Sequence, residues 1–276
     1  MKKLLALLLA LVMVLSFAAC GEEAEAPVEG EENVGGETEE LTAENIKIGF
    51  VHVSDPSDMG YTYNHDLGTW KMAENLGISE DQIINKYNIG EDEGCATAIE
   101  ELIEAGCNII FATSFGHGDY MTEAAANHPE IQFCHATGTQ AHTAGYANFH
   151  NAFASIYEGR YLAGVAAGMK LNEMIAAGEF TAEEAKMGYV GAFTYAEVIS
   201  GYTSFYLGAK YVCPTVTMDV QFTGSWYDEA LEKEAATALI ADGCVVMSQH
   251  ADSEGAPKAC EEAGVPNIAY NLDTRE

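Results

Sequence analysis

Short hydrophobic runs alternate with longer amphipathic segments along most of this chain. The first run, Ile46–Val53, ends at the polar turn Ser54–Asp58 and is followed by a helix-like segment from Gly60 to Leu76. A buried strand, a polar turn and a helix form the opening unit of an open α/β sheet. Ligands bind such sheets at the carboxyl ends of the strands, so this turn is the first candidate for a binding site.

The same alternation continues through the rest of the chain. Strands are predicted at 82–89, 108–112, 131–135, 145–149, 186–192, 217–222, 244–249 and 266–271, and helices at 95–105, 156–169, 197–211, 229–241 and 254–263, with a short helix ending near 128. Strands that alternate with helices in this way predict parallel sheets with right-handed crossovers.

Two pairs of segments repeat at an offset of about 140 residues. Lys47 opens KIGFV and Lys186 opens KMGYV, while LIEAGCNIIF at Leu102 matches LIADGCVVMS at Leu239. This period is far longer than those of solenoids and propellers. We interpret the repeat as two similar Rossmann-like lobes joined by a hinge; chance similarity between α/β units is the alternative.

The repeat and a change of composition after Phe153 suggest how the folded part divides. We expect the first lobe at 44–152, the second at 153–264, and the start of a return to the first lobe at 265–276. A two-lobed receptor normally has several elements beyond this point, so we expect the C-terminal part to be missing from this sequence.

The N-terminus is predicted to be a targeting segment, residues 1–20. Two lysines precede an apolar run, 4–17, that is short for a transmembrane span. Small residues then precede Cys20, as in a bacterial lipobox, although Phe17 stands where leucine is usual. We expect Cys20 to be lipidated; an ordinary signal peptide that leaves Cys20 as a bystander is the alternative.

Residues 21–43 are predicted to form a disordered tether. They contain nine glutamates between Glu22 and Glu40 and no lysine or arginine. Such a segment repels itself and cannot bury a core. A lipid anchor and a flexible tether would hold the folded part at the extracytoplasmic face of the cell membrane.

Charge and cysteine usage narrow the function further. The formal net charge of −31 disfavours nucleic acid and anionic ligands. Six cysteines follow Cys20, and none forms a CxxC pair or a Cys/His spacing typical of a metal site. We favour free thiols, although an exported protein permits disulfides.

Seven segments, in order, resemble the basic membrane protein family of ABC-transporter substrate-binding lipoproteins, most closely its purine-binding branch. They are SDMGYTYNHDLG, IIFATSFGHGDYM, YEGRYLAG, YVGAFTYAEVISGYTSFYLGA, TGSWYDEALEKEAA, VVMSQHADS and IAYNLDT. The resemblance implies the periplasmic-binding-protein type I fold, no cofactor, and a cleft in which aromatic rings stack a nucleobase.

Aromatic residues follow predicted strands in both lobes and agree with that implication. Tyr61, Phe115, Phe193 and Trp226 are the candidates. Stacking on such rings contributes about 1–3 kcal/mol per base. Tyr61 replaces a tryptophan common in the purine-binding branch, so its stacking is expected to be weaker. The alternative for each ring is an ordinary place in the core.

Polar residues near the same strand ends are candidates to orient a ligand, since Asn and Asp read base edges by paired hydrogen bonds. They are Asp55, Asn64, Ser114, Asp119, Asp252 and Asn271. Asn271 stands where nucleoside-binding relatives have aspartate, which suggests a preference for free base. Asp58 and Asp66 are expected to cap or decorate the first helix instead.

These observations predict a monomeric, membrane-tethered receptor that captures a purine nucleoside or nucleobase and delivers it to an ABC permease. A sugar or signalling molecule is the alternative ligand. An enzyme such as a nucleoside hydrolase is disfavoured, since the chain has no dense aspartate cluster and no GxSxG. His65–Asp66 and His117 with Asp119 are the candidate acid–base pairs, while His250 is expected to be a ligand contact or a capped structural histidine. A purely structural or antigenic lipoprotein would bind no small molecule saturably.

Overall fold

The computed structural model of the chain describes residues 40–271. The signal segment with Cys20, most of the predicted tether, and residues 272–276 lie outside the described residues. The compact unit that contains the described helices and strands begins at Leu41. The Ala43 carbonyl accepts a hydrogen bond of 3.0 Å from Gln82 Nε2, so the last residues of the predicted tether belong to the fold.

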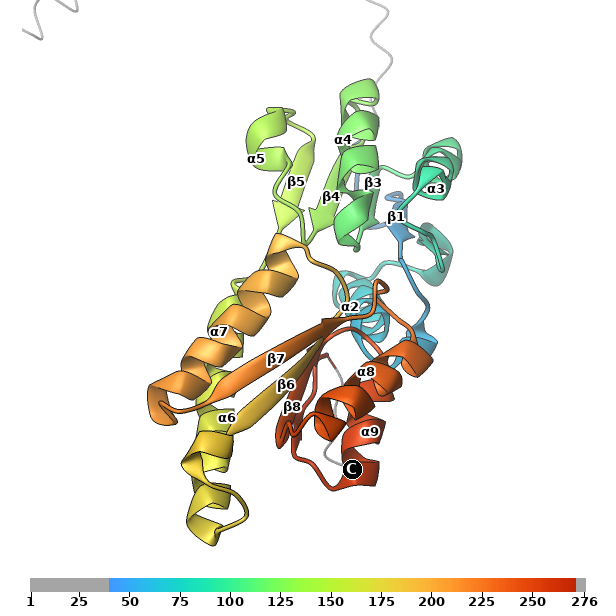
Figure 1. Cartoon of the computed structure of the whole chain (residues 1–276). Helices are drawn as coiled ribbons and strands as arrows, with labels where there is room; N and C mark the ends of the chain where they lie inside the picture. Colours follow the sequence, from blue (N-terminus) through green and yellow to red (C-terminus); the bar gives the residue numbers. More distant parts are fainter. Residues whose placement is uncertain (1–39, 272–276) are drawn as a thin grey trace, which may run out of the picture. The chain divides into compact units, whose positions relative to one another are not determined.

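Two parallel sheets organise this unit (Figure 1). The first has the strand order β2-β1-β3-β4-β5 and the second has the order β7-β6-β8-β9. The strands are β1 (Ile48–Val51), β2 (Ile83–Lys86), β3 (Ile109–Ala112), β4 (Gln132–Ala136), β5 (Phe149–Ala152), β6 (Lys186–Gly191), β7 (Thr217–Phe222), β8 (Val246–His250) and β9 (Asn267–Ile268). The predicted fold class, two α/β lobes with parallel sheets, is confirmed.

Helices cover both faces of each sheet. They are α2 (Tyr61–Leu76), α3 (Glu93–Glu104), α4 (Gly118–Asn127), α5 (Ala141–Ala144), α6 (Ile156–Ala177), α7 (Ala196–Val212), α8 (Glu229–Ala241) and α9 (Gly255–Ala263), with short 3₁₀ turns such as η1 (Pro56–Asp58) and η3 (Phe115–His117). Neighbouring residues of β6 show the two faces. Tyr189 packs in a core with α6 and α7, whereas Val190 packs with α8 and α9.

Three predicted elements differ from the structure. The strand predicted at 145–149 is β5, which starts at Phe149, because Gly145 has a left-handed φ of 75° and ends the unpredicted helix α5. Helix α6 continues past residue 169 to Ala177 and ends at Gly178, whose φ is 77°. The last predicted strand shortens to β9, which pairs with β8 in the second sheet.

The sequence repeat corresponds to the same local structure in each lobe. Lys47 Nζ donates to the Ala105 carbonyl at 3.0 Å, and Lys186 Nζ donates to the Asp242 carbonyl at 3.1 Å. The backbone amides of Cys107 and Cys244 each donate at 3.1 Å to the carbonyl of a helix leucine, Leu102 or Leu239. Equivalent bonds at equivalent positions favour duplication over chance similarity.

The cysteines follow the expectation of free thiols. All six between residues 40 and 271 are free, and five of them are buried. Burial raises the pKa of Cys95 to about 12 and that of Cys244 to about 11. Within the described range, no helix combines the length and hydrophobicity needed to cross a membrane.

Glycines bring α6 and α7 into close contact in the second lobe. A Cβ on Gly164 would lie 2.0 Å from the Phe205 carbonyl oxygen, and one on Gly208 would lie 2.0 Å from the Tyr161 carbonyl oxygen. Both obstacles are backbone atoms, which have little freedom to move. The two helices can therefore approach closely only while these positions lack side chains.

We predict that Gly164→Ala destabilises the protein by about 1–3 kcal/mol, because the methyl group must push α6 and α7 apart. Gly159→Ala, in the same helix but with open space around the added Cβ, is the control and should be neutral or stabilising by up to about 1 kcal/mol. Urea denaturation measures both. Equal stabilities of the two variants would contradict this packing.

Candidate functional site

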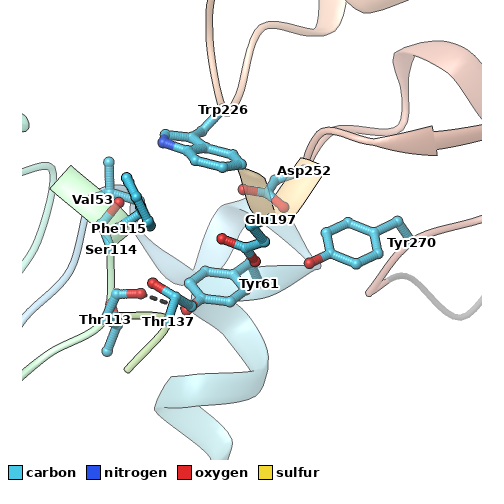
Figure 2. Close-up of a pocket in the computed structure, with 10 residues that line it drawn as sticks. All are labelled: Val53, Tyr61, Thr113, Ser114, Phe115, Thr137, Glu197, Trp226, Asp252 and Tyr270. Carbon is cyan, nitrogen blue, oxygen red and sulfur yellow. Dashed lines mark hydrogen bonds between the residues drawn. The ribbon is translucent and has the colours of Figure 1, made fainter. Parts of the chain in front are cut away.

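A cavity of about 290 Å³ lies between the carboxyl ends of the two sheets (Figure 2). This volume includes space that is open to solvent. Its ten lining residues are Val53, Tyr61, Thr113, Ser114, Phe115, Thr137, Glu197, Trp226, Asp252 and Tyr270. Both lobes contribute, as expected for a site that closes around a ligand.

The fold explains why these residues meet. Val53, Thr113 and Thr137 come just after β1, β3 and β4, while Trp226, Asp252 and Tyr270 follow β7, β8 and β9. Parallel strands all end at the same edge of a sheet, so residues distant in sequence gather there. The cavity is therefore built by two such edges that face each other.

Aromatic rings form a continuous group beside the cavity. Phe115 of the first lobe stacks on Tyr195 of the second, with ring centroids 4.8 Å apart and an interplanar angle of 28°. Phe193 stacks on Tyr195 at 5.1 Å and meets Trp226 edge-on at 5.3 Å. Rings held in this way present flat apolar surfaces to a planar ligand.

Two carboxyl groups, Glu197 and Asp252, complete the lining (Figure 2). Burial raises the pKa of Asp252 well above its ordinary value, and the nearby carboxylates of Asp58, Glu232 and Glu197 raise it further. A protonated Asp252 can both donate and accept a hydrogen bond. The cavity thus offers apolar ring faces together with polar groups suited to a neutral ligand.

The wall behind Tyr270 contains a buried cation. Arg160 is 4% exposed, donates to the Gln249 carbonyl at 2.8 Å, and lies 4.2 Å from the Tyr270 ring centroid. The His250 ring packs on Tyr270 itself, with centroids 4.4 Å apart, and burial lowers the pKa of His250. These contacts fix the orientation of Tyr270 at the cavity.

Asp58 holds the turn that the sequence identified as the first candidate site. Its buried carboxylate accepts hydrogen bonds from the backbone amides of Gly60, Thr62 and Tyr63 at 2.8–3.0 Å. This confirms the expectation that Asp58 caps the first helix. Tyr61, at the start of α2, is thereby directed into the cavity, and its hydroxyl donates to the Thr113 carbonyl.

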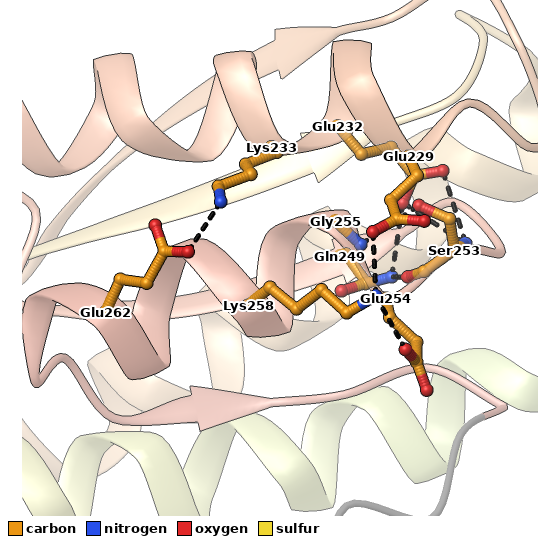
Figure 3. Close-up of polar contacts among 9 residues, drawn as sticks. All are labelled: Glu229, Glu232, Lys233, Gln249, Ser253, Glu254, Gly255, Lys258 and Glu262. Atoms are coloured by element: carbon orange, nitrogen blue, oxygen red, sulfur yellow. Dashed lines mark hydrogen bonds and ion pairs between the residues drawn. The ribbon is translucent and has the colours of Figure 1, made fainter.

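Glu232 holds the loop that carries Asp252 (Figure 3). Its fully buried carboxylate accepts hydrogen bonds from the Ser253 amide at 3.2 and 3.3 Å and from the Asp228 amide at 3.2 Å. Gln249 Nε2 donates to the carbonyls of Ala251 and Ser253 on the same loop. On the outer surface of α8 and α9, Lys258 pairs with Glu229 and Lys233 pairs with Glu262.

Five of the ten sequence candidates lie in the cavity wall. They are Tyr61, Ser114, Phe115, Trp226 and Asp252. Phe193 lines an adjoining outer cleft together with Trp226 and Asp252. Ser114 Oγ donates to Glu91 at 2.7 Å, which leaves its lone pairs for a ligand.

The other four candidates do not line the cavity. Asp55 accepts from the Ser57 amide and from Asn88, and Asp119 is exposed on α4. Asn64 donates to the carbonyls of Gly60 and Asn271 at 2.7 and 2.9 Å. Asn271 has a left-handed φ of 57° and lies beside Asp252, whose pKa its amide side chain lowers.

Sequence reasoning missed five lining residues, Val53, Thr113, Thr137, Glu197 and Tyr270. Their position along the chain could have identified them, because each follows a strand or begins a helix at the carboxyl edge of its sheet. Thr137 also has a φ of 67°, which is unusual for a β-branched residue and has no counterpart in the sequence pattern.

The acid–base pairs considered for an enzyme do not form. Asp66 accepts hydrogen bonds from Tyr87 and Trp70 rather than from His65, and burial lowers the pKa of His65 to about 4. His117 is buried and contacts the Ile89 carbonyl, while Asp119 is exposed. No group of three or more His, Cys, Asp or Glu in residues 40–271 is arranged to hold a metal ion.

Known proteins resemble this chain in sequence and fold. A purine-binding protein of Brucella abortus is 35% identical over 232 residues, which cover 83% of this chain and 61% of that protein. A putative ABC transporter glucose-binding protein of Haloferax volcanii is 32% identical over 237 residues, covering 86% and 55%. A solute-binding protein from Aeropyrum pernix has a TM-score of 0.72 at 20% identity, covering 81% of this chain and 61% of that one.

Fold and cavity together define a two-lobed α/β protein with a cavity between its lobes. A family model described as "ABC transporter substrate-binding protein PnrA-like" matches residues 45–275. The chain belongs to this family, the Bmp family, which confirms the resemblance seen in its motifs. That description is of a binding protein of a transporter, and the two relatives above are likewise described as binding proteins and not as enzymes. The chain spans 55–61% of the length of the two curated relatives above.

Burial raises the pKa of Glu232 to about 7, and we predict a matching pH dependence of stability. Its pKa is raised in the folded state, so the folded protein binds more protons than the unfolded chain between about pH 4.5 and 7. Stability from this group is therefore lost as pH rises through that window, by about 3 kcal/mol in all.

Glu232→Gln should remove this contribution. The difference in the free energy of unfolding between this variant and the wild type, measured by urea denaturation at several pH values, should therefore change by this amount across the window. Glu234→Gln, at an exposed position of the same helix, is the control and should leave the pH profile unchanged. Parallel profiles for wild type and Glu232→Gln would contradict the assignment.

Proposed function

We propose that this chain is the ligand-capturing part of an ABC importer's substrate-binding lipoprotein and that it binds a purine nucleobase or nucleoside. The observation that carries the proposal is a small cavity walled by rings from both lobes, Phe115 and Trp226 among them, with carboxyl groups at Glu197 and Asp252. Rings stack a flat base, and carboxyl groups pair with its N–H donors or with ribose hydroxyls. The purine-binding relative from Brucella abortus supports this choice.

The proposed mechanism is closure of the two lobes around the ligand. Because the lining residues come from both sheets, a bound base completes contacts with both lobes only in the closed form. A ligand that binds one conformation better shifts the population toward it. The closed complex would then be the form that an ABC permease recognises at the extracytoplasmic face of the membrane, where lipidation of Cys20 would anchor the chain.

A sugar is the second candidate ligand, favoured by the relative described as a putative glucose-binding protein. Aromatic faces and carboxyl groups suit a sugar ring as well as a base. The two candidates therefore differ in which compounds stabilise the protein and not in the type of site.

A thermal-shift panel should identify the ligand class. We expect adenine, guanine, adenosine, guanosine or inosine to raise the melting temperature, because a ligand at 100 times its dissociation constant adds about 2.7 kcal/mol of stability. Uridine, glucose, galactose and ribose are included for comparison. A response to sugars alone would overturn the purine proposal, and a cooperative melt that no compound shifts would contradict both.

Stacking at Trp226 should be visible in the affinity for the purine that binds best. We predict that Trp226→Ala weakens binding by about 1–3 kcal/mol, which is about 5- to 150-fold in dissociation constant by calorimetry. Trp70→Phe, at a 37%-exposed position on α2, is the matched control and should not change affinity. Equal affinities of Trp226→Ala and wild type would contradict stacking at this residue.

The position of Asn271 beside Asp252 supports a role in choosing between base and nucleoside. An aspartate there would accept hydrogen bonds from ribose hydroxyls, whereas asparagine also donates. We predict that Asn271→Asp raises the affinity for adenosine relative to adenine. An unchanged ratio of the two dissociation constants would contradict this role.

A further inference from the structure

Glu91 lies at the junction of the two lobes and is not explained by the site described above. It occupies the loop between β2 and α3, and it lines the outer cleft but not the inner cavity. One carboxylate oxygen, Oε1, accepts three hydrogen bonds. Ser114 Oγ donates at 2.7 Å, the Gly116 amide at 2.6 Å, and Trp226 Nε1 at 3.1 Å.

The first two donors, Ser114 and Gly116, hold the Glu91 carboxylate against the first lobe. A Cβ on Gly116 would lie 2.5 Å from Glu91 Cδ and 2.6 Å from its Cβ, so the Glu91 side chain occupies space that any other residue at 116 would fill. Ser114 and Gly116 flank Phe115, the ring that lines the cavity. The position of the carboxylate is therefore set by the same turn that places Phe115.

The third donor belongs to the second lobe and is held there independently. The Trp226 carbonyl accepts a hydrogen bond of 2.8 Å from the Asp252 amide, and the Trp226 ring meets Phe193 edge-on. The loop before it is braced by Thr223 Oγ1, which donates to the Ser225 carbonyl at 2.9 Å. Hydrogen bonds and ring contacts within the second lobe thus hold the Trp226 indole in place to donate to Glu91.

The contact lies where the inner cavity meets the outer cleft. Both spaces are lined by Val53, Trp226 and Asp252, but Glu91 lines only the outer one. The Glu91–Trp226 pair therefore lies beside the place where the two spaces adjoin. Separation of the lobes must also break this hydrogen bond, in addition to the Phe115–Tyr195 stack.

We propose that Glu91 is a latch residue, which accepts the indole N–H of Trp226 to hold the two lobes closed and thereby sets how long a ligand stays in the cavity. It is a positioning residue and does not contact the ligand. A hydrogen bond to a charged group is stronger than one between neutral groups. The part of the proposal that concerns residence time rests on the proposed function, whereas the part that concerns lobe closure does not.

The first test needs no ligand. In a Trp70→Phe background, Trp226 is the only tryptophan of the chain, which has two. Glu91→Ala should open the junction and raise the acrylamide quenching constant of Trp226 fluorescence at least twofold. Glu91→Gln keeps an acceptor oxygen but loses the charge, and should give a smaller increase. It also serves if Glu91→Ala fails to fold, which circular dichroism would reveal.

The second test is a double-mutant cycle on ligand release, with adenine as the probe and dissociation followed by stopped flow. Glu91→Ala and Trp226→Phe each remove one partner of the bond, and Trp226→Phe keeps an aromatic ring. Removing the latch should speed adenine dissociation about 10-fold or more. The two substitutions share one interaction, so Glu91→Ala should add little once Trp226→Phe is present.

The outcomes separate the latch from the proposed ligand. Unchanged quenching in both Glu91 variants overturns the latch, and so do rate effects of Glu91→Ala and Trp226→Phe that multiply in the double variant. If wild-type protein binds no adenine or other purine, the proposed function fails, and the quenching measurement alone decides whether Glu91 holds the lobes together.

Discussion

The close approach of a helix to a strand glycine is the constraint on which both halves of the molecule depend. A Cβ on Gly49 of β1 would lie 2.8 Å from Leu102 of α3, and one on Gly188 of β6 would lie 3.1 Å from Leu239 of α8. Each helix thereby lies close against its sheet, and the lysine two residues before each glycine closes the helix end onto the strand. The carboxyl edges of both sheets, and hence the cavity between them, follow from this packing.

Carboxylates have two distinct roles around the cavity. Asp58 and Glu232 face backbone amides and hold the loops that carry Tyr61 and Asp252, and they are as buried as the hydrophobic core. Their acceptor oxygens satisfy amides that would otherwise be unpaired, which offsets the cost of burying charge. Asp58 and Glu232 thus support the site structurally, whereas the buried carboxyl groups of Glu197 and Asp252 line the cavity itself.

The sequence was sufficient for the fold class, the repeat and half of the cavity wall, because these depend on local pattern. Alternating strands and helices place Phe115, Trp226 and Asp252 at strand ends, and strand ends converge in parallel sheets. The rest of the cavity wall depends on which hydrogen-bond partners each polar side chain finds in the folded chain. Asp55 and Asn64 form hydrogen bonds with neighbouring backbone groups and do not line the cavity. Nothing in the spacing of residues 91 and 226 indicated that Glu91 and Trp226 form a hydrogen bond. The fifth strand starts later than predicted because the left-handed Gly145 ends helix α5, which is too short to show a helical pattern of hydrophobic residues.

The duplicated frame also gives the two lobes different chemistry at one shared position. Phe115 is the eighth residue after Cys107, and Asp252 is the eighth after Cys244, so the two occupy corresponding places beyond the third strand of their repeats. Both line the cavity, one with an apolar ring and the other with a carboxyl group. A symmetric ancestor with the same residue in both places would have had two apolar rings or two carboxyl groups at these positions. Divergence at this single pair gives corresponding positions of the site an apolar ring and a carboxyl group, while the packing that builds each lobe stays the same.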